Sequence, residues 1–136
     1  MISLKKVRSE FVNMDLDLKS RMDLDPLVHA LGSAVLTLHA DKIGQRHWVR
    51  LELMRQPKSP SQAIRGFSRI VGRLPKQARK IWDQAAKELD IGVQGGLNPL
   101  TAEWVLEPTV VQMTCKLGAQ VRFTLYSPLV GDPIRK

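Results

Sequence analysis

Apolar and polar residues alternate along several stretches of the chain, and the clearest of these runs from Phe11 to Lys19. From residue 12 onwards the even-numbered positions are apolar and the odd-numbered positions are polar. A period of two is the pattern of a strand with one buried face. The positions expected to face the core are Val12, Met14, Leu16 and Leu18.

Four further stretches have the character of strands. Residues 34–40 and 47–54 flank the turn-forming residues 41–45, which predicts an antiparallel hairpin. A short strand over 89–94 ends at a glycine turn, and 119–126 alternates again. The side chains expected to point inwards are Ala34, Leu36 and Leu38 opposite Val49, Leu51 and Leu53, and then Val121, Phe123 and Leu125 in the last strand.

Capping residues and prolines mark the helices between these strands. A carboxylate before a proline begins a helix well, because the side chain accepts a free N–H and proline lacks one. A glycine ends a helix well, because it adopts left-handed conformations readily. The predicted helices run from Asp25 to Gly32, from Ser61 with an interruption at Pro75, and from Pro108 to Gly118.

These elements predict one α+β domain. The order is strand, helix, strand, strand, helix, strand, helix, strand, with a mainly antiparallel sheet of about five strands and helices on one face. The opening resembles the ferredoxin-like plan with an added helix and strand. We expect a single domain over residues 10–127, with flexible tails at 1–9 and 128–136.

Charge is concentrated in the middle of the chain. The 136 residues carry a net charge of +8, but the segment from Lys42 to Lys87 holds twelve Lys or Arg against two acids. An asymmetry of this kind favours an anionic partner, although a charged surface also serves solubility.

The predicted second helix carries a basic ridge, defined as Arg65, Arg69, Arg73, Lys76 and Lys80. The three arginines are spaced four apart, so they repel one another on a single helix face. Such a face is best explained by an anionic partner. An acidic protein surface and nucleic-acid phosphates both meet that description.

The face of the sheet opposite the helices is predicted to be open and polar. Asp15 and Asp17 project from it two residues apart, as ion-pair partners for Arg50 or Arg122 or as ligands of a divalent metal. Ion pairing needs no further ligands, and two carboxylates would repel phosphates. Trp48 is equally placed for a homodimer contact. The candidate residues of this face are Asp15, Asp17, Trp48, Arg50, Arg122 and Tyr126.

Side-chain chemistry elsewhere argues against an enzyme. The hairpin register places His39 opposite Arg46 or Trp48 rather than His47, and no third zinc ligand is suitably spaced. Cys115 falls at the border of an apolar helix stripe and is expected to pack there. Nucleotide-binding and hydrolase motifs are absent. We therefore expect no catalytic residue, no metal and no cofactor.

The cellular location is expected to be the cytoplasm. The single cysteine excludes an internal disulfide, which fits a reducing compartment. The basic N-terminus is not followed by the apolar region of a secretory signal, and no apolar run is long enough to cross a membrane.

Four stretches of the chain carry a further resemblance: FVNMDLDL, DPLVHALG, ELDIGVQ and LGAQVRFTLY. Together they resemble small bacterial domains of unknown function, some of them similar to immunity proteins encoded beside secreted toxins. The resemblance implies a non-enzymatic protein-binding domain that neutralises a toxin by covering its surface. It carries over no site residue, and this chain is basic where immunity proteins against nucleases are commonly acidic, so the toxin would need an acidic surface. The alternative is an accessory protein that contacts nucleic-acid phosphates through the region from Arg65 to Lys80.

Overall fold

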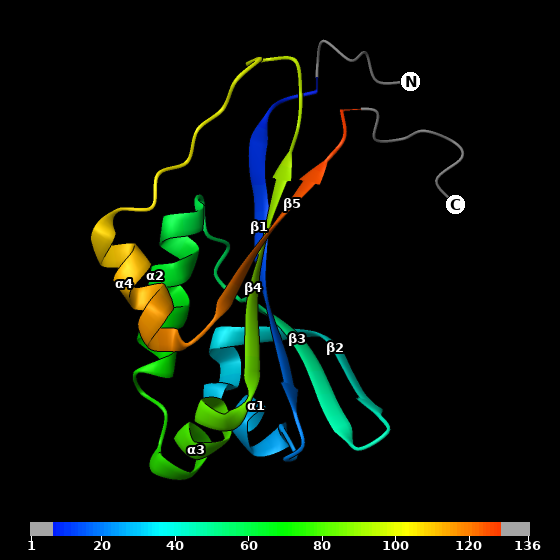
Figure 1. Cartoon of the computed structure of the whole chain (residues 1–136), viewed down its shortest axis with the longest axis vertical. Coiled ribbons are helices and arrows are strands. Elements are labelled where there is room, and N and C mark those ends of the chain that lie inside the picture. The colour runs from blue at the N-terminus through cyan, green and yellow to red at the C-terminus, as the bar shows by residue number, and fades with distance from the viewer. Residues whose placement is uncertain (1–6, 129–136) are drawn as a thin grey trace.

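A computed structural model describes residues 7–128 of the chain, as four α-helices, one short 3-10 helix and five strands (Figure 1). In chain order these are β1 (Glu10–Ser20), α1 (Asp25–Leu31), the 3-10 helix η2 (Gly32–Ala34), β2 (Val35–Ile43), β3 (Arg46–Leu53), α2 (Pro60–Val71), α3 (Lys76–Gln84), β4 (Ala86–Gln94), α4 (Pro108–Leu117) and β5 (Gln120–Tyr126). The α+β class and the predicted element order are confirmed, with the second helix divided into α2 and α3.

The sheet has the order β2-β3-β1-β4-β5. Every neighbouring pair is antiparallel except β4 and β5, which run parallel. β4 and β5 are parallel because the chain leaves the end of β4, passes back through α4 and enters β5 at the end of the sheet where β4 began. The first four strands, with β1 between β3 and β4, follow the ferredoxin-like plan that the sequence predicted.

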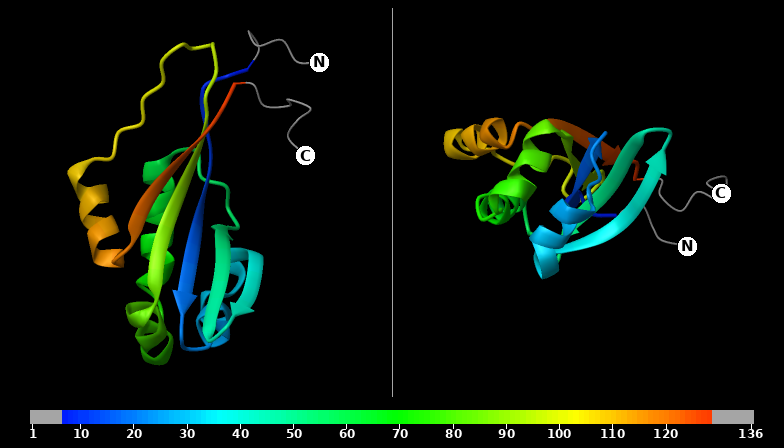
Figure 2. Two further views of the ribbon diagram at one scale, coloured as in Figure 1. Left: turned by 45° about the vertical axis from the view of Figure 1, so that its right-hand side comes forward. Right: turned by 90° about the horizontal axis from the view of Figure 1, so that it is seen from below.

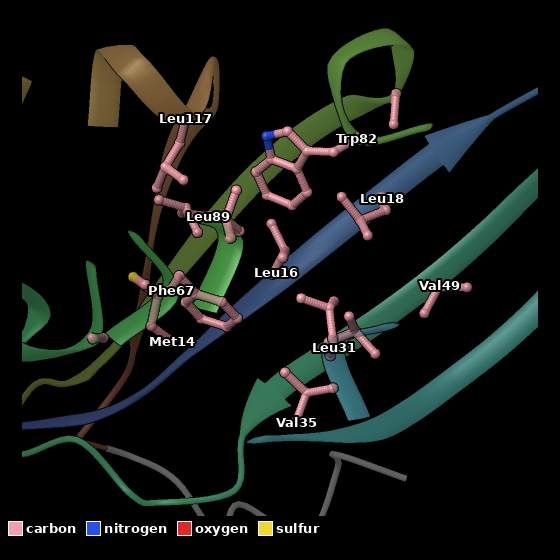
Figure 3. Packing of buried hydrophobic residues seen from close by; sticks show 14 of the residues in the cluster. Met14, Leu16, Leu18, Leu31, Val35, Val49, Phe67, Trp82, Leu89 and Leu117 are labelled. Carbon is pink, nitrogen blue, oxygen red and sulfur yellow. The ribbon is translucent and has the colours of Figure 1, made fainter. Parts of the chain in front are cut away.

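The helices gather on one side of the twisted sheet and enclose a single core (Figure 2). Figure 3 shows Phe67 of α2 and Trp82 of α3 projecting onto the apolar side chains of β1 and β4. Both aromatic side chains are at most 1% exposed. Burying a side chain of this size contributes on the order of 2–3 kcal/mol, so these two anchor the helix layer to the sheet.

The helix boundaries agree with the predicted positions but not with every predicted cap. Ser59, rather than Ser61, caps α2, its hydroxyl accepting the Gln62 N–H at 3.1 Å. Asp25 is not the cap of α1; instead the Asp23 carboxylate accepts the Asp25 N–H at 2.9 Å. In both cases the useful oxygen lies two residues earlier, where the backbone is still outside the helix.

Two β-bulges change which residues face the core. Between Phe11 and Asn13 the β1–β4 register shifts, which leaves Val12 48% exposed while Phe11 packs against the core. A second shift at Leu38 in β2 has the same effect, so the expectation that Leu36 and Leu38 face inwards was wrong. An extra residue in one strand reverses the alternation on one side of the bulge.

The paired part of the chain extends beyond the predicted N-terminal boundary. Arg8 forms an isolated bridge with Asn98, and the Ser9 hydroxyl donates to the Gly96 and Pro99 carbonyl groups. Residues 1–6 of the predicted N-terminal tail and residues 129–136 of the predicted C-terminal tail lie outside the described residues. Among the described helices, none is long and apolar enough to cross a membrane.

Candidate functional site: a basic groove and a carboxylate network

A groove with a volume of about 940 Å³ lies between α2 and the segment that follows β3. Its basic residues are Arg55, Lys58, Arg65 and Arg69, and no acid among the described residues lines it. We call this feature the basic groove. Its remaining lining is Ser33, Ala34, Leu53, Met54, Gln56, Pro57, Gln62, Gly66 and Ile70.

The cations of the basic groove are largely without internal partners. Arg65 forms an ion pair with Glu107, with 3.1 Å between its Nη2 atom and the carboxylate. Within residues 7–128, Arg55, Lys58 and Arg69 form no ion pair with any acid. All three are exposed, so their charge is available to a partner at little desolvation cost.

Two local features position the walls of the groove relative to each other. The backbone N–H of Lys58 donates to the Gln62 side chain at 2.7 Å, which ties the incoming segment to the first turn of α2. Gly66 faces β3, and a Cβ atom there would lie 2.7 Å from Leu53 Cδ1. The glycine therefore allows Leu53 to pack closely against α2. Met54, which is 54% exposed, adds apolar surface beside the basic residues.

The structure separates the basic ridge into two parts. Arg65 and Arg69 line the groove, whereas Arg73, Lys76 and Lys80 do not. The expectation that Arg65, Arg69 and Arg73 share one helix face was wrong. α2 ends at Val71 and α3 begins at Lys76, so Arg73 lies in the turn between them and only Arg65 and Arg69 keep the four-residue helical spacing. Arg55 and Lys58 join the groove instead, from the segment between the predicted strand over 47–54 and the predicted helix that begins at Ser61. The sequence indicated a binding role for them only in that both lie within the basic segment from Lys42 to Lys87.

The open sheet face carries rows of charged residues set by the strand register. One row places Asp15 between Glu52 of β3 and Asp90 of β4. The next row places Asp17 between Arg50 and Glu88. Opposed side chains on one face lie close together, so these rows form one connected group, which we call the carboxylate network. Its members are Asp15, Asp17, Arg50, Glu52, Glu88, Asp90 and Arg122.

Asp17 and Arg50 form the centre of the network. The Arg50 guanidinium donates to both Asp17 carboxylate oxygens at 2.8 Å, and the Trp48 indole N–H donates to the same carboxylate at 3.3 Å. Asp17 is only 8% exposed, and hydrogen bonding to it raises the pKa of Arg50. The prediction that Arg50 pairs with these aspartates is confirmed. A bidentate contact of this kind fixes both side chains.

Asp15 is in a less favourable position than Asp17. Burial raises the pKa of Asp15 to about 6, against an ordinary value of 3.8, and the Glu52, Asp90 and Asp17 carboxylates add to the rise. Arg50 opposes it only from 3.9 Å, because its guanidinium is occupied by Asp17. Asn13 supplies a hydrogen bond to Asp15 at 3.2 Å and another to Glu52. Two aspartates two residues apart thus have opposite environments.

The remaining residues of this face lie at its margins. Arg122 pairs with Glu88 at 3.1 Å rather than with Asp15 or Asp17. Tyr126 lies opposite Gln94, while Trp48 lies in the row of Lys19 and Ala86. Eight positions along β4 separate these rows, or roughly 26 Å. The two aromatic residues therefore do not form a common platform for stacking bases.

His39 and His47 do not lie opposite each other on the β2–β3 hairpin. His39 opposes Arg50 rather than Arg46 or Trp48, so the predicted partner was wrong, while His47 opposes Lys42. The His39 ring lies 4.3 Å from the Trp48 ring. Within the described residues, no three His, Cys, Asp or Glu side chains are grouped to hold a metal ion. Cys115 is exposed rather than packed as predicted.

No protein-family model, curated protein or solved structure matches this chain. The basic groove and the carboxylate network are therefore the features from which we infer a function.

Proposed function

We propose that this protein is a non-enzymatic cytoplasmic binding domain that holds an acidic segment of a protein partner in the basic groove. One observation carries the proposal: four cations surround a groove without a lining acid, and three of them form no ion pair within residues 7–128. Unpaired like charges are held together against their mutual repulsion. A negatively charged ligand removes that repulsion and gains attraction from each cation.

The composition of the groove favours a protein segment over nucleic acid. Leu53, Met54 and Ile70 offer apolar contacts next to the cations, which suits a segment that alternates acidic and apolar side chains. Binding of nucleic acid needs cations spread along the path of its phosphate backbone. Arg73, Lys76 and Lys80 would extend such a path, but they lie outside the groove.

The test uses a fluorescent peptide that alternates glutamate with leucine, measured by anisotropy at low salt. Full-chain protein should bind it and should bind a lysine–leucine peptide far less. The triple variant Arg55→Glu/Lys58→Glu/Arg69→Glu should lose about a hundredfold or more in affinity, because it reverses three unpaired charges. These side chains are exposed, so the variant should remain folded by circular dichroism.

The matched control is Arg73→Glu/Lys76→Glu/Lys80→Glu, which changes the net charge by the same amount outside the groove. We expect it to lower affinity by no more than about threefold, through long-range charge alone. Equal losses in both triple variants would show that net charge, not the groove, binds the peptide, and would contradict the proposal.

Random DNA and RNA form the second arm of the test, since nucleic-acid binding is the competing function. If phosphates are the ligand, affinity should be clear at about 50 mM salt and fall about a thousandfold by about 200 mM. Tighter binding of nucleic acid than of the acidic peptide, lost in the control variant, would replace the proposal with that alternative.

The finer form of the proposal takes the partner to be a toxin with an acidic surface, as the resemblance to immunity proteins implies. It rests on that resemblance alone. Co-expression with the product of the neighbouring gene is the appropriate measurement. Restored growth that depends on the groove cations supports the finer form, and a neighbour without toxicity removes it while leaving the peptide-binding proposal intact.

A further inference from the structure

One edge of the sheet is apolar and unpaired. β5 is the last strand, and no described segment pairs with its outer side (Figure 1). Phe123 is 64% exposed and Leu125 70%, so the expectation that both are buried was wrong: the helix layer covers only Val121 of this strand. An edge of this kind is a template for pairing with another strand.

The backbone of β5 presents regular hydrogen-bonding groups outwards. The Gly95 N–H donates to the Tyr126 carbonyl at 2.8 Å, which places the Tyr126 backbone groups on the β4 side. Because direction alternates along a strand, the N–H and C=O groups of Val121, Phe123 and Leu125 point away from β4. The pairing with β4 runs through seven consecutive positions without a register shift, so this outer row is not interrupted.

The opposite edge of the sheet differs in this respect. β2 also exposes apolar side chains, including Ile43 at 64%. However, its ladder is broken by the bulge at Leu38, and it carries the charged residues Asp41 and Lys42. Bulges and charges are the usual means by which an edge strand avoids pairing. β5 has neither a bulge nor an unpaired charge.

We propose that β5 pairs antiparallel with β5 of a second copy of this chain, about a twofold axis at Phe123. Phe123 is the midpoint of the strand, so this register pairs all seven residues. It brings Phe123 opposite Phe123 of the second copy and Val121 opposite Leu125, through the outward backbone groups. A twofold interface requires a surface that is complementary to itself, and β5 meets that condition.

The distribution of charge favours the register with the axis at Phe123, and it favours a second copy of the chain as the partner of β5. Arg122 is the only charged residue of β5, and Glu88 neutralises it at 3.1 Å. With the axis at Phe123, Arg122 lies opposite the neutral Thr124, whereas an axis at Arg122 would oppose two arginines directly. A chain of net charge +8 would otherwise repel its copy, so a neutral edge is the place where two copies can meet.

Sedimentation equilibrium of the full chain over a range of concentrations tests this pairing. We expect a dimer at concentrations of about 100 μM, and we expect Phe123→Glu to weaken it about a hundredfold or more by opposing two carboxylates and removing two apolar contacts. Ile43→Glu is the matched control, because Ile43 has the same exposed fraction in the other edge strand. It should leave the dimer unchanged.

Amide hydrogen exchange gives a second readout that does not depend on a variant. The outward amides of Val121, Phe123 and Leu125 should become protected as the concentration rises, while those that face β4 are protected throughout. A chain that remains monomeric at about 500 μM overturns the pairing and leaves this edge to another protein's strand. A dimer that Ile43→Glu breaks and Phe123→Glu does not would overturn it equally.

Discussion

The basic groove and the carboxylate network both concentrate charged side chains, but most charges are unpaired in the groove and the central charges are paired in the network. In the groove, Arg55, Lys58 and Arg69 are exposed and form no ion pair within the described residues. In the network, Asp17 is 8% exposed and receives three hydrogen bonds from Arg50 and Trp48. Charges that are already paired stabilise the chain internally. Charges without partners add nothing to stability and are free to bind a ligand.

This contrast predicts that substitutions in the two regions separate stability from binding. Network residues should change the free energy of unfolding and leave binding of an acidic peptide unaffected. Groove residues should do the reverse.

The largest stability effect is expected from Arg50→Met. It keeps much of the side-chain length but leaves Asp17 as a nearly buried carboxylate without its charged partner. We expect a loss of about 2–4 kcal/mol at neutral pH, measured by urea unfolding. Arg122→Met is the control: its ion pair with Glu88 is exposed, so its loss should cost no more than about 0.5 kcal/mol. Similar costs at both positions would mean that the network is not organised around Asp17.

A smaller effect of opposite sign is expected from Asp15→Asn. The pKa of about 6 lies above the ordinary 3.8, so the folded chain binds this proton more tightly than the unfolded chain. That contribution to stability is fully present below about pH 4 and is lost as the pH rises through about 6. The substituted amide would keep an oxygen acceptor for Asn13 and carry no charge at any pH.

Asp15→Asn should therefore stabilise the protein at pH 7.5 by about 1 kcal/mol, a figure reduced to allow for solvent screening. The gain should disappear as the pH falls from about 7 to about 4, which urea titrations at several pH values would show. Asp17→Asn, two residues away, should instead destabilise at pH 7.5. A loss of stability in both variants would contradict the difference between the two aspartates.

The smallest stability effect is expected from Arg55→Glu/Arg69→Glu. Both side chains are exposed and without ion-pair partners among residues 7–128. The free energy of unfolding, measured by thermal denaturation, should therefore change by less than about 0.5 kcal/mol. A small gain is equally consistent, because the reversal relieves repulsion between neighbouring cations. A large loss would mean that these arginines serve the fold rather than a partner.

The sequence predicted the elements well because strong local signals determine them. The alternation in β1, the proline that begins α4 and the break at Pro75 each act within a few residues. The bulges at Val12 and Leu38 could not be foreseen, because the alternation of residue types continues through them while the backbone does not. Side-chain direction beyond each bulge depends on the partner strand.

The residues of the two sites were likewise predictable only in part. Arg65 and Arg69 were recognisable from helical spacing, but Arg55 and Lys58 reach the groove only because α2 packs beside the segment after β3. Likewise, Asp15 lies between Glu52 and Asp90 because the sheet order places β1 between β3 and β4. Neither neighbour is close in sequence. Tertiary contacts of this kind are the part that the pattern of residues does not contain.

The most direct test of the basic groove is a nuclear magnetic resonance titration of isotope-labelled full-chain protein with the glutamate–leucine peptide. We predict that shifts concentrate in the backbone of residues 54–58 and 62–70 and in the guanidinium signals of Arg55, Arg65 and Arg69. The signals of Asp15, Asp17 and Arg50 should stay in place. Shifts centred on residues 73–80, or on the open sheet face, would contradict the groove as the binding site.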